Sequence, residues 1–417
     1  MGTIHIVGGN KLEGSIYIQG SKNAALPILA ATLLTRGVCV LKNCPHIADV
    51  YEMLEILKDL GSIVWEENDR LCIAAPEKLR THIDKKHVES MRSSIVLLGV
   101  LLGENGYVSM EYPGGCVIGE RPIDMHINGL EKLGCRFDSS NQKLEAKVQR
   151  FIGAEIVLPF PSVGATENII LAAVKAKGIT KIYGAAKEPE IVYLCEFLNS
   201  CGGNIKGAGT DCIWIEGVLD LHACEYEIPA DRIVAGTYIM SALAAKGSIL
   251  IKNAPIKDMK EVLCTLGRMG AFLRYRDDGL IVSYDGILRA ISLETAVYPG
   301  FPTDLQSTML VLLSVAEGKG SIRENLYENR FRIVSELKKM NADVSVYGNL
   351  AVTQGPCNLK GARVQAKELR GNAALIMAAL LAEGKSTVED CRYVKRGYED
   401  ICRDLKSLGA IIYEKEE

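Results

Sequence analysis

The stretch that decides the fold lies near the start of the chain, where residues 20–34 read GSKNAALPILAATLL. From residue 24 onward the positions are apolar or small on nearly every side of a helix. A helix without a polar face is buried inside a domain instead of lying on its surface. The stretch therefore predicts a central helix, which neither an ordinary sandwich nor a doubly wound sheet contains.

Segments of this kind recur along the chain and end in Gly37, Gly106, Gly178, Gly247, Gly318 and Gly384, with gaps of 69, 72, 69, 71 and 66 residues. After each glycine come a short β-type run, a charged helical stretch and two short strands. The charged stretch ends 23 to 28 residues beyond the glycine, at Gly61, Gly134, Gly202, Gly270, Asn341 and Gly409. The pattern predicts six units of helix, strand, helix, strand, turn and strand.

Each unit is expected to hold two kinds of helix. The second helices, such as residues 50–60, 257–269 and 332–340, are amphipathic and belong on the outside. The first helices are apolar all round and belong in the centre, with sheets around them. The predicted central helices are residues 24–34, 93–102, 168–176, 234–245, 307–316 and 373–382. The fold class is thus α/β, with two halves of three units each.

The ends of the chain complicate this division, because the strand predicted at Thr3–Val7 has no helix before it. We expect it to pair with the strand at Gly14–Ile18, and both to join the C-terminal half. Residues 22–229 then form the first domain, which carries a loop around Cys116, and residues 1–21 and 230–417 form the second. The chain crosses between them near Gly20 and near Pro229.

Composition excludes several classes of protein. A length of 417 residues favours two domains, and a net charge of −3 lacks the basic surplus of a nucleic-acid binder. The 13 cysteines include no CxxC pair, which argues against a zinc ribbon and a disulfide framework. The N-terminus has no signal-peptide pattern, and the apolar runs are too short to span a membrane. We expect a cytoplasmic protein without a membrane partner.

The positions before the central helices point to an anionic ligand. Helix N-termini carry partial positive charge and free N–H groups, so cations are disfavoured there unless an anion is present. The alternative is that these positions are ordinary caps and solvated ends. Caps explain Ser93, Thr166 and Asp304, but not lysine or arginine. The recurring positions are Lys22, Arg92, Gly164, Arg232, Asp304 and Arg370.

A second candidate feature is the loop YPGGCVIGERP at residues 112–122. Its glycines and prolines favour a loop, and a cation beside Cys116 favours the thiolate, so the thiol could act as an acid or nucleophile. A cysteine in a lid loop without a catalytic role is the alternative. Further cations, Arg121, Arg330 and Arg396, lie in polar loops, where surface residues are the commoner case. His126 is more often structural than catalytic.

Taken together, these residues resemble the enolpyruvyl transferases, and among them the branch that acts on a UDP-sugar. The resemblance runs nearly end to end and is carried by residues 20–25, 113–116, 121–124, 161–166, 299–306, 328–331 and 396–399. It implies a two-domain inside-out α/β barrel. It also implies transfer of the enolpyruvyl group of phosphoenolpyruvate to the 3′-hydroxyl of UDP-N-acetylglucosamine, the first committed step of peptidoglycan synthesis, without a metal or cofactor.

The resemblance implies roles for individual residues. Cys116 is the acid and the thiol that fosfomycin alkylates, Asp304 takes or orients the hydroxyl proton, Lys22 is also catalytic, and Glu368 is a candidate for acid–base support. The phosphoenolpyruvate set is Lys22, Asn23, Arg121, Arg330, Arg370 and Arg396. The UDP-N-acetylglucosamine set is Asn23, Arg92, Arg121, Pro122, Ile123, Asp124, Met125, Ser162, Val163, Gly164, Asp304 and Leu326.

The sequence departs from the family pattern in two places. Residues 367–370 read KELR where the family has TDLR, so the carboxylate of Glu368 reaches one methylene further. Residues 393–395 read YVK where the family has HID. Two alternatives therefore stand beside the main interpretation. One is 5-enolpyruvylshikimate-3-phosphate synthase on the same fold, and the other is a UDP-sugar-binding paralogue with impaired catalysis.

Overall fold

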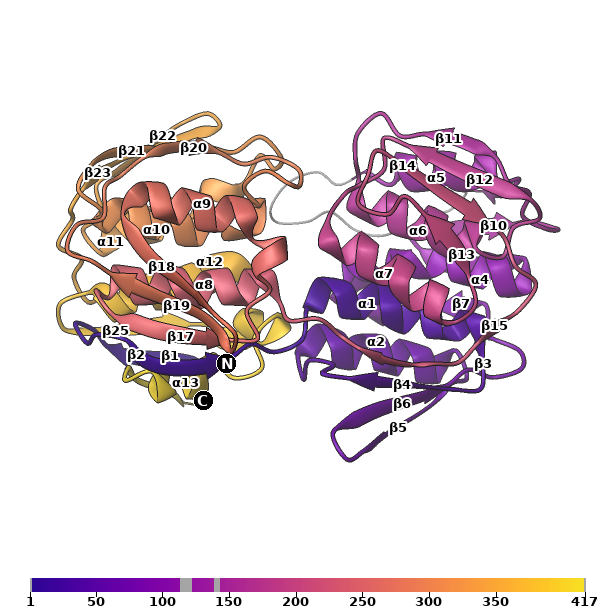
Figure 1. Cartoon of the computed structure of the whole chain (residues 1–417), viewed down its shortest axis with the longest axis horizontal. Helices are drawn as coiled ribbons and strands as arrows, with labels where there is room; N and C mark the ends of the chain where they lie inside the picture. The colour runs from indigo at the N-terminus through magenta and orange to yellow at the C-terminus, as the bar shows by residue number, and fades with distance from the viewer. Residues whose placement is uncertain (1, 113–121, 139–142, 416–417) are drawn as a thin grey trace. The chain divides into compact units, whose positions relative to one another are not determined.

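The computed structural model describes residues 2–112, 122–138 and 143–415. These divide into two compact units, and each has its own hydrophobic core (Figure 1). The chain leaves one unit after Gln19 and returns to it at Ala230. We call the described part of residues 20–229 the middle unit, and residues 2–19 with 230–415 the terminal unit.

The middle unit is built around helices from three repeats. Helices α1 (Lys22–Ala31), α4 (Leu97–Asn105) and α6 (Val163–Ala173) are buried along most of their length. Around them lie α2 (Ala48–Asp59), α3 (Lys85–Ser90), α5 (Asp124–Lys132) and α7 (Pro189–Ser200). The strands are β3 (Thr35–Arg36), β4 (Val38–Lys42), β5 (Ile63–Glu67), β6 (Arg70–Ala74), β7 (His82–Ile83), β8 (Tyr107–Glu111), β9 (Arg136–Asp138), β10 (Lys143–Lys147), β11 (Glu155–Val157), β12 (Ile179–Tyr183), β13 (Asn204–Lys206), β14 (Cys212–Glu216), β15 (Leu221–His222) and β16 (Glu225–Glu227).

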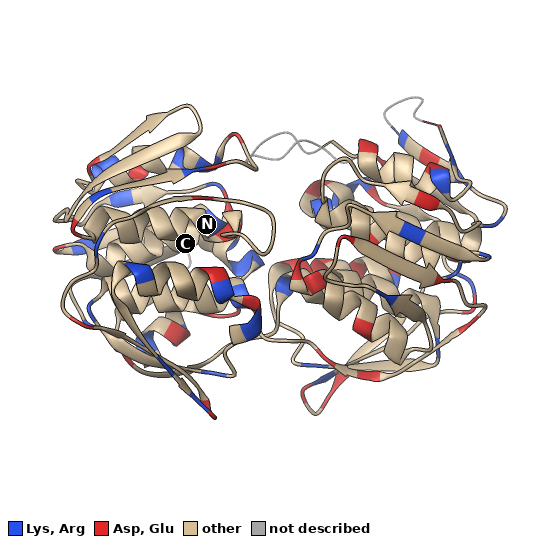
Figure 2. Ribbon diagram, turned by 45° about the horizontal axis from the view of Figure 1, so that its top comes forward, with Lys and Arg blue, Asp and Glu red and all other residues tan. Residues whose placement is uncertain are grey.

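The terminal unit repeats this plan. Its central helices are α8 (Arg232–Ala244), α10 (Gln306–Val315) and α12 (Leu369–Leu381), and they carry no charge beyond their first turns. Figure 2 marks the charged residues of the chain in blue and red. The outer helices are α9 (Lys260–Met269), α11 (Val334–Lys339) and α13 (Ile401–Ser407). The strands are β1 (Thr3–Val7), β2 (Glu13–Tyr17), β17 (Ser248–Lys252), β18 (Ala271–Arg276), β19 (Gly279–Tyr284), β20 (Ser292–Glu294), β21 (Gly318–Arg323), β22 (Val344–Tyr347), β23 (Leu350–Gly355), β24 (Arg363–Gln365), β25 (Lys385–Glu389) and β26 (Ile411–Lys415).

Each repeat contributes one four-stranded sheet in the described residues. The strand orders are β16-β4-β6-β5, β7-β8-β10-β9 and β11-β12-β14-β13 in the middle unit, and β18-β19-β17-β2, β20-β21-β23-β22 and β24-β25-β1-β26 in the terminal unit. In four of them the edge strand that precedes the central helix pairs parallel with the strand that follows it, as β11 does with β12. In the other two the partners are exchanged: β2, before α1, pairs with β17, after α8, and β16, before α8, pairs with β4, after α1. The predicted repeat and the α/β class with central helices are confirmed.

The N-terminal strands correct one prediction, because β1 and β2 do not pair with each other. β1 runs antiparallel between β25 and β26, with Ile4 opposite Val388 and Glu414. β2 instead pairs parallel with β17, with Ile16 opposite Ile251. The start of the chain thus supplies one strand to each of two sheets. The two strands do not pair with each other because each buries its isoleucines as a member of a different sheet.

The glycine markers have a conformational cause. All six markers at the ends of the charged stretches lie in the left-handed region, from Gly61 at φ 110° to Gly409 at φ 98°, and Asn341 adopts φ 67°. Glycine enters this region without steric cost and asparagine tolerates it. Gly247 is glycine for a different reason, since a Cβ there would strike the carbonyl oxygen of Leu12.

The predicted second central helix does not begin as an α-helix. Residues Arg92–Val96 form a 3-10 helix, η2, before α4 continues the segment. The buried amide of Asn168 lies across the junction, donating to the Ile95 carbonyl at 2.7 Å and accepting from the Gly99 N–H at 2.7 Å. These two groups would otherwise bond each other in an α-helix, so a side chain from α6 replaces one backbone hydrogen bond of the helix.

No helix within the described residues is long and apolar enough to cross a membrane.

Candidate functional site

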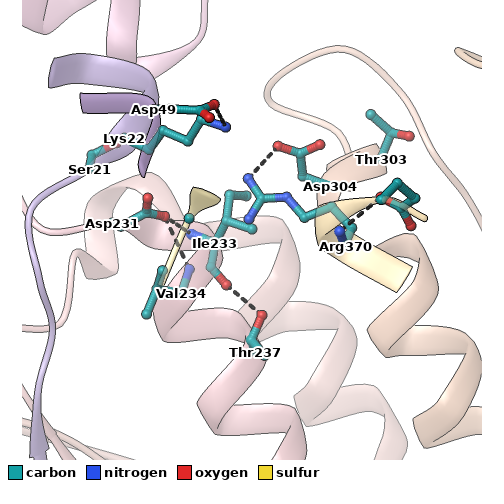
Figure 3. Close-up of polar contacts among 12 residues, drawn as sticks. Ser21, Lys22, Asp49, Asp231, Ile233, Val234, Thr237, Thr303, Asp304 and Arg370 are labelled. Carbon is teal, nitrogen blue, oxygen red and sulfur yellow. Dashed lines mark hydrogen bonds and ion pairs between the residues drawn. The ribbon is translucent and has the colours of Figure 1, made fainter. Parts of the chain in front are cut away.

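Two arginines and one carboxylate meet where the central helices of the terminal unit begin. Asp304, in the 3-10 helix η5 (Thr303–Leu305) before α10, accepts from Arg330 Nη2 through Oδ1 and from Arg370 Nη2 through Oδ2, both at 2.8 Å. Figure 3 shows the Asp304–Arg370 contact. The arginine side chains are 4% and 7% exposed, so both cations are nearly withdrawn from water. The structure thus brings three of the predicted site residues together.

Arg330 is held by a chain of polar contacts. Its Nε donates to the Thr303 hydroxyl at 3.2 Å, and that hydroxyl donates to Glu324 at 2.9 Å. The other oxygen of Glu324 accepts from the N–H groups of Leu326 and Tyr327, at 2.9 and 3.2 Å. The guanidinium also lies over the Tyr327 ring at 5.2 Å. Since Nε and Nη2 are both engaged, the fork of Arg330 has little freedom to rotate away.

Arg370 lies in the first turn of α12 and is nearly fully buried. Burial, the largest influence, lowers its pKa, but the carboxylates of Asp304 and Asp231 and the nearby Tyr398 outweigh it and raise the pKa above the ordinary value. Burial has the opposite effect on an acidic group and raises the pKa of Tyr398, whose hydroxyl is 2.8 Å from that of Thr237. Arg370 is therefore a permanent cation placed beside an acid and a neutral phenol.

Glu368 has a structural function that the sequence did not reveal. It is the N-cap of α12, and its carboxylate accepts from the backbone N–H groups of Arg370, at 2.8 Å, and Gly371. Its Oε2 also lies 3.7 Å from Arg330 Nη1. Both oxygens are thus already engaged, which leaves less scope for the predicted acid–base support.

The segment that carries Arg396 is anchored by a residue that sequence reasoning missed. Gln19 donates to the Gly397 carbonyl at 3.2 Å and accepts from the Glu399 N–H at 2.9 Å. Gly397 itself lies against Leu369, where a Cβ would come within 2.7 Å of a leucine methyl. The half-buried Arg396 thus ends a 3-10 helix packed against the start of α12.

In the middle unit, Lys22 begins α1 behind the capping hydroxyl of Ser21. Its ammonium lies 2.5 Å from Oδ2 of Asp49, a carboxylate with a 5% exposed side chain in the first turn of α2 (Figure 3). Asn23 and Arg92 are half-buried at the starts of α1 and η2. Asp49 was missed because an acidic residue in a first turn is an ordinary helix feature, and only the fold buries it beside Lys22.

The remaining predicted ligands of the middle unit lie around the starts of α5 and α6. Ser162 caps α6, and a Cβ on Gly164 would lie 3.1 Å from the His126 ring. His126 is buried and its Nδ1 accepts from the Asn168 amide at 2.9 Å, so its role is at least structural. Ile123 is buried, Met125 is half-buried, and Pro122 and Asp124 are exposed at the start of α5.

Some of the predicted assignments need correction, and two cannot be placed. The caps expected at Ser93, Thr166 and Asp304 are wrong: the side chains that cap central helices are Ser21, Ser162, Asp231 and Glu368. The Thr166 hydroxyl instead donates back to the Ser162 carbonyl.

Cys116 and Arg121 lie outside the described residues. Within the described residues, no cluster of three or more histidine, cysteine or acidic side chains could hold a metal.

Comparison with known proteins gives consistent results. A family model described as EPSP synthase (3-phosphoshikimate 1-carboxyvinyltransferase) matches residues 6–405. Two proteins of Caldanaerobacter subterraneus, named UDP-N-acetylglucosamine 1-carboxyvinyltransferase 2 and 1, are 44% and 42% identical over 99% and 97% of this chain, and over 99% and 97% of their own lengths. UDP-N-acetylglucosamine 1-carboxyvinyltransferase 1 of Halalkalibacterium halodurans is 41% identical over 99% of this chain and 94% of its own.

Solved structures agree on the fold. The enolpyruvyl transferase NikO from Streptomyces tendae superposes with a TM-score of 0.89 at 23% identity, covering 99% of both chains. An EPSP synthase from Acinetobacter baumannii superposes with a TM-score of 0.77 at 17% identity, covering 100% of both chains. At these identities the likeness concerns the fold alone.

Proposed function

The chain belongs to the EPSP synthase family of 1-carboxyvinyltransferases and, within it, to the UDP-N-acetylglucosamine 1-carboxyvinyltransferases. From this premise we propose that it transfers the enolpyruvyl group of phosphoenolpyruvate to the 3′-hydroxyl of UDP-N-acetylglucosamine and releases phosphate. The reaction has two stages. The hydroxyl oxygen bonds to C2 while C3 gains a proton, and then C3 loses a proton as the C2–O bond to phosphate breaks. An acid and a base are needed in both stages.

The observation that carries the proposal is that two buried arginines, Arg330 and Arg370, are both paired with Asp304. The relatives of this chain are named for the same activity. A guanidinium has five donors, and the contacts to Asp304, Thr303 and Glu368 leave part of each fork available. Arg330 and Arg370 can therefore bind a carboxylate or phosphate while Asp304 keeps them oriented. The carboxylate of Asp304 can also accept the proton of the sugar 3′-hydroxyl.

The other roles extend the proposal to residues that the structure does not test. We assign protonation of C3 to Cys116, and phosphate binding to Lys22, Arg121 and Arg396. Asn23, Arg92, Leu326 and the segments 121–125 and 162–164 are assigned to the UDP-sugar. In the structure Lys22 is paired with Asp49, which lends support because a pre-ordered lysine loses less rotamer freedom when it binds an anion.

Phosphate release from phosphoenolpyruvate tests the function directly. We expect turnover with UDP-N-acetylglucosamine as acceptor and none with shikimate 3-phosphate. Release with shikimate 3-phosphate alone would identify the family's other activity, and release with neither would leave a UDP-sugar-binding protein without catalysis. Isothermal titration calorimetry with UDP-N-acetylglucosamine separates this last case from a protein that does not bind the sugar.

The role of Cys116 has its own test. Cys116→Ala is expected to lose most turnover while binding UDP-N-acetylglucosamine unchanged, because the acid is removed and the sugar contacts remain. Cys264→Ala, a change at an exposed cysteine in α9, is the matched control. Intact-protein mass spectrometry should show one fosfomycin adduct, located on Cys116. An adduct on any other thiol would contradict the assignment.

A further inference from the structure

Three cysteines meet in the middle unit, away from the residues discussed above. Cys39 lies in β4, Cys201 directly follows α7, and Cys224 directly precedes β16. Backbone hydrogen bonds join these segments: Val40 N–H donates to the Cys224 carbonyl at 3.0 Å, and His222 N–H donates to the Cys201 carbonyl at 2.9 Å. The three side chains are therefore held together by the sheet and by the end of a helix.

The sulfur atoms are in contact within this frame. Cys201 Sγ lies 3.4 Å from Cys224 Sγ and donates to it. Cys39 Sγ contacts the thiol of Cys201 as well, and lies 3.2 Å from the Thr35 hydroxyl. Cys201 is thus the central member. An S–S bond is about 2.05 Å long, so the sulfur atoms of Cys201 and Cys224, now 3.4 Å apart, must approach by about 1.4 Å to form one.

We propose that Cys39, Cys201 and Cys224 form a peroxide-responsive thiol site, in which Cys201 and Cys224 are oxidised to a disulfide. The inference does not depend on the enzymatic function. Cys39 and Cys201 are fully buried, whereas Cys224 is half-buried, so Cys224 is the member that a small oxidant reaches first. Structural cysteines usually pack as small apolar side chains, and a thiol in contact with two others, as Cys201 is, differs from that pattern.

Contact with Cys201 also makes both of its neighbours more acidic. Cys201 donates its single S–H to Cys224. Its contacts with Cys224 and Cys39 lower the pKa of both of those thiols and raise the pKa of Cys201 itself. The thiolate is the nucleophile in thiol chemistry. Cys224 and Cys39 are therefore the thiols that ionise, and Cys201 supplies the stabilising S–H.

The chemistry balances with hydrogen peroxide as the oxidant. The Cys224 thiolate attacks one peroxide oxygen and becomes a sulfenic acid, releasing hydroxide, which takes up a proton to form water. The Cys201 thiol then gives its proton to the departing hydroxyl, which leaves as a second water, while its sulfur attacks the sulfenic sulfur and forms the S–S bond. Two thiols and one peroxide thus give one disulfide and two waters. Cys39 can next attack Cys201, which moves the bond to Cys39–Cys201 and frees Cys224 without further oxidant.

Disulfide mapping of the full-length protein tests the proposal. The reduced protein is treated with hydrogen peroxide, blocked with N-ethylmaleimide, digested with trypsin without reduction and analysed by mass spectrometry. Cys195 shares a tryptic peptide with Cys201, and Cys212 shares one with Cys224. The variants Cys195→Ala and Cys212→Ala therefore serve as matched controls that must keep the cross-link.

The expected result is a Cys201–Cys224 link that is retained in Cys39→Ala and lost in Cys201→Ala. Anaerobic treatment of the wild-type protein with dibromobimane, which bridges neighbouring thiols, should join the same pair and needs no variant to fold. The exposed Cys264 reports that peroxide has acted. Oxidation of Cys264 with all three cluster thiols still free would overturn the proposal, as would a Cys224 sulfinic acid formed without any cross-link.

Discussion

At the scale of single residues, Asp304 does more than a catalytic assignment from sequence suggests. It is the shared counter-charge of Arg330 and Arg370, and each of its oxygens accepts from one of them. Two buried guanidinium groups would repel each other without it. The same carboxylate therefore stabilises the fold locally and orients the cations proposed to bind the substrate.

Asp304→Asn tests this double function. The amide keeps the shape of the side chain but removes the negative charge, so two buried cations lose their partner. We expect the free energy of unfolding to fall by about 3 kcal/mol and turnover to fall roughly 100-fold or more, as when a proton-transfer group is removed. Urea titration and the phosphate assay measure the two effects.

Asp278→Asn is the control, since Asp278 pairs with Arg276 on an exposed turn where both side chains are about half exposed. Exposed pairs contribute about 0–1 kcal/mol, so stability and turnover should stay close to wild type. Equal stability of the two variants would show that Asp304 is not the counter-charge of the arginines.

At the scale of secondary-structure elements, the start of α12 shows how one side chain serves two purposes. Glu368 caps the helix through two backbone N–H groups and faces Arg330 at 3.7 Å. Glutamate is an uncommon N-cap compared with aspartate or serine. Its extra methylene is accommodated because the carboxylate folds back onto the N–H groups of residues 370 and 371.

Glu368→Ala is therefore expected to destabilise the protein by about 1 kcal/mol through loss of the cap. Glu368→Asp is the matched control. It keeps the carboxylate and introduces a preferred capping residue, so the free energy of unfolding should stay within about 0.5 kcal/mol of wild type. A Glu368→Ala variant as stable as wild type would show that the cap contributes nothing.

Helices α2 and α3 are joined by a buried histidine. His87 is 2.6 Å from Glu52 through Nδ1 and 2.9 Å from Asp59 through Nε2. Burial lowers its pKa, but the hydrogen bonds that the ring donates to Asp59 and Glu52 outweigh this effect, and the pKa is raised above 6.5. The hydrogen bond from His87 in turn lowers the pKa of Asp59.

The sign of the resulting pH dependence follows from linkage. A raised histidine pKa contributes stability that is fully present below pH 6.5 and is lost as the pH rises through the folded-state value. Wild-type stability should thus fall more steeply than that of His87→Gln as the pH rises above 6.5. His82→Gln, at an exposed histidine beside Asp84, is the control and should retain the wild-type slope. Parallel curves for all three proteins would contradict the prediction.

At the scale of the whole molecule, the two chain ends meet within one sheet of the terminal unit. β1 lies between β25 and β26, with Thr3 opposite Lys415. Ile4 and Ile6 are 1% exposed, so the first residues of the chain belong to the core. The sheet of the sixth repeat is therefore incomplete until both ends of the chain are present.

Circular permutation tests this arrangement. Joining the termini by a short glycine–serine linker and opening the chain in the exposed turn at residues 207–211 leaves every strand pair intact. Such exposed turns tolerate new ends, so the permutant should melt within a few degrees of wild type. Deletion of residues 1–8 removes a central strand and should abolish the cooperative transition. A deletion variant with the wild-type melting temperature would contradict the pairing.

Sequence by itself determined the features that repeat. The six apolar helices could be predicted because an all-apolar helix has only one environment available to it, and the glycine markers because left-handed φ angles restrict the residue type. The family followed from several separate motifs in order, and the resemblance supplied the site predictions for Lys22, Asp304, Arg330 and Arg370. These properties are local, since each depends on residues close together in the chain.

Tertiary structure alone decided which of those residues make contact. Pairing of β1 with β25 and β26, burial of Asp49 beside Lys22, and the support of Arg330 by Thr303 and Glu324 join residues that local patterns do not connect. Glu368 as a cap and the three clustered thiols belong to the same class. Hydrogen bonds and charge pairs depend on distances of a few ångströms, and such distances between remote segments exist only after the helices and sheets have packed.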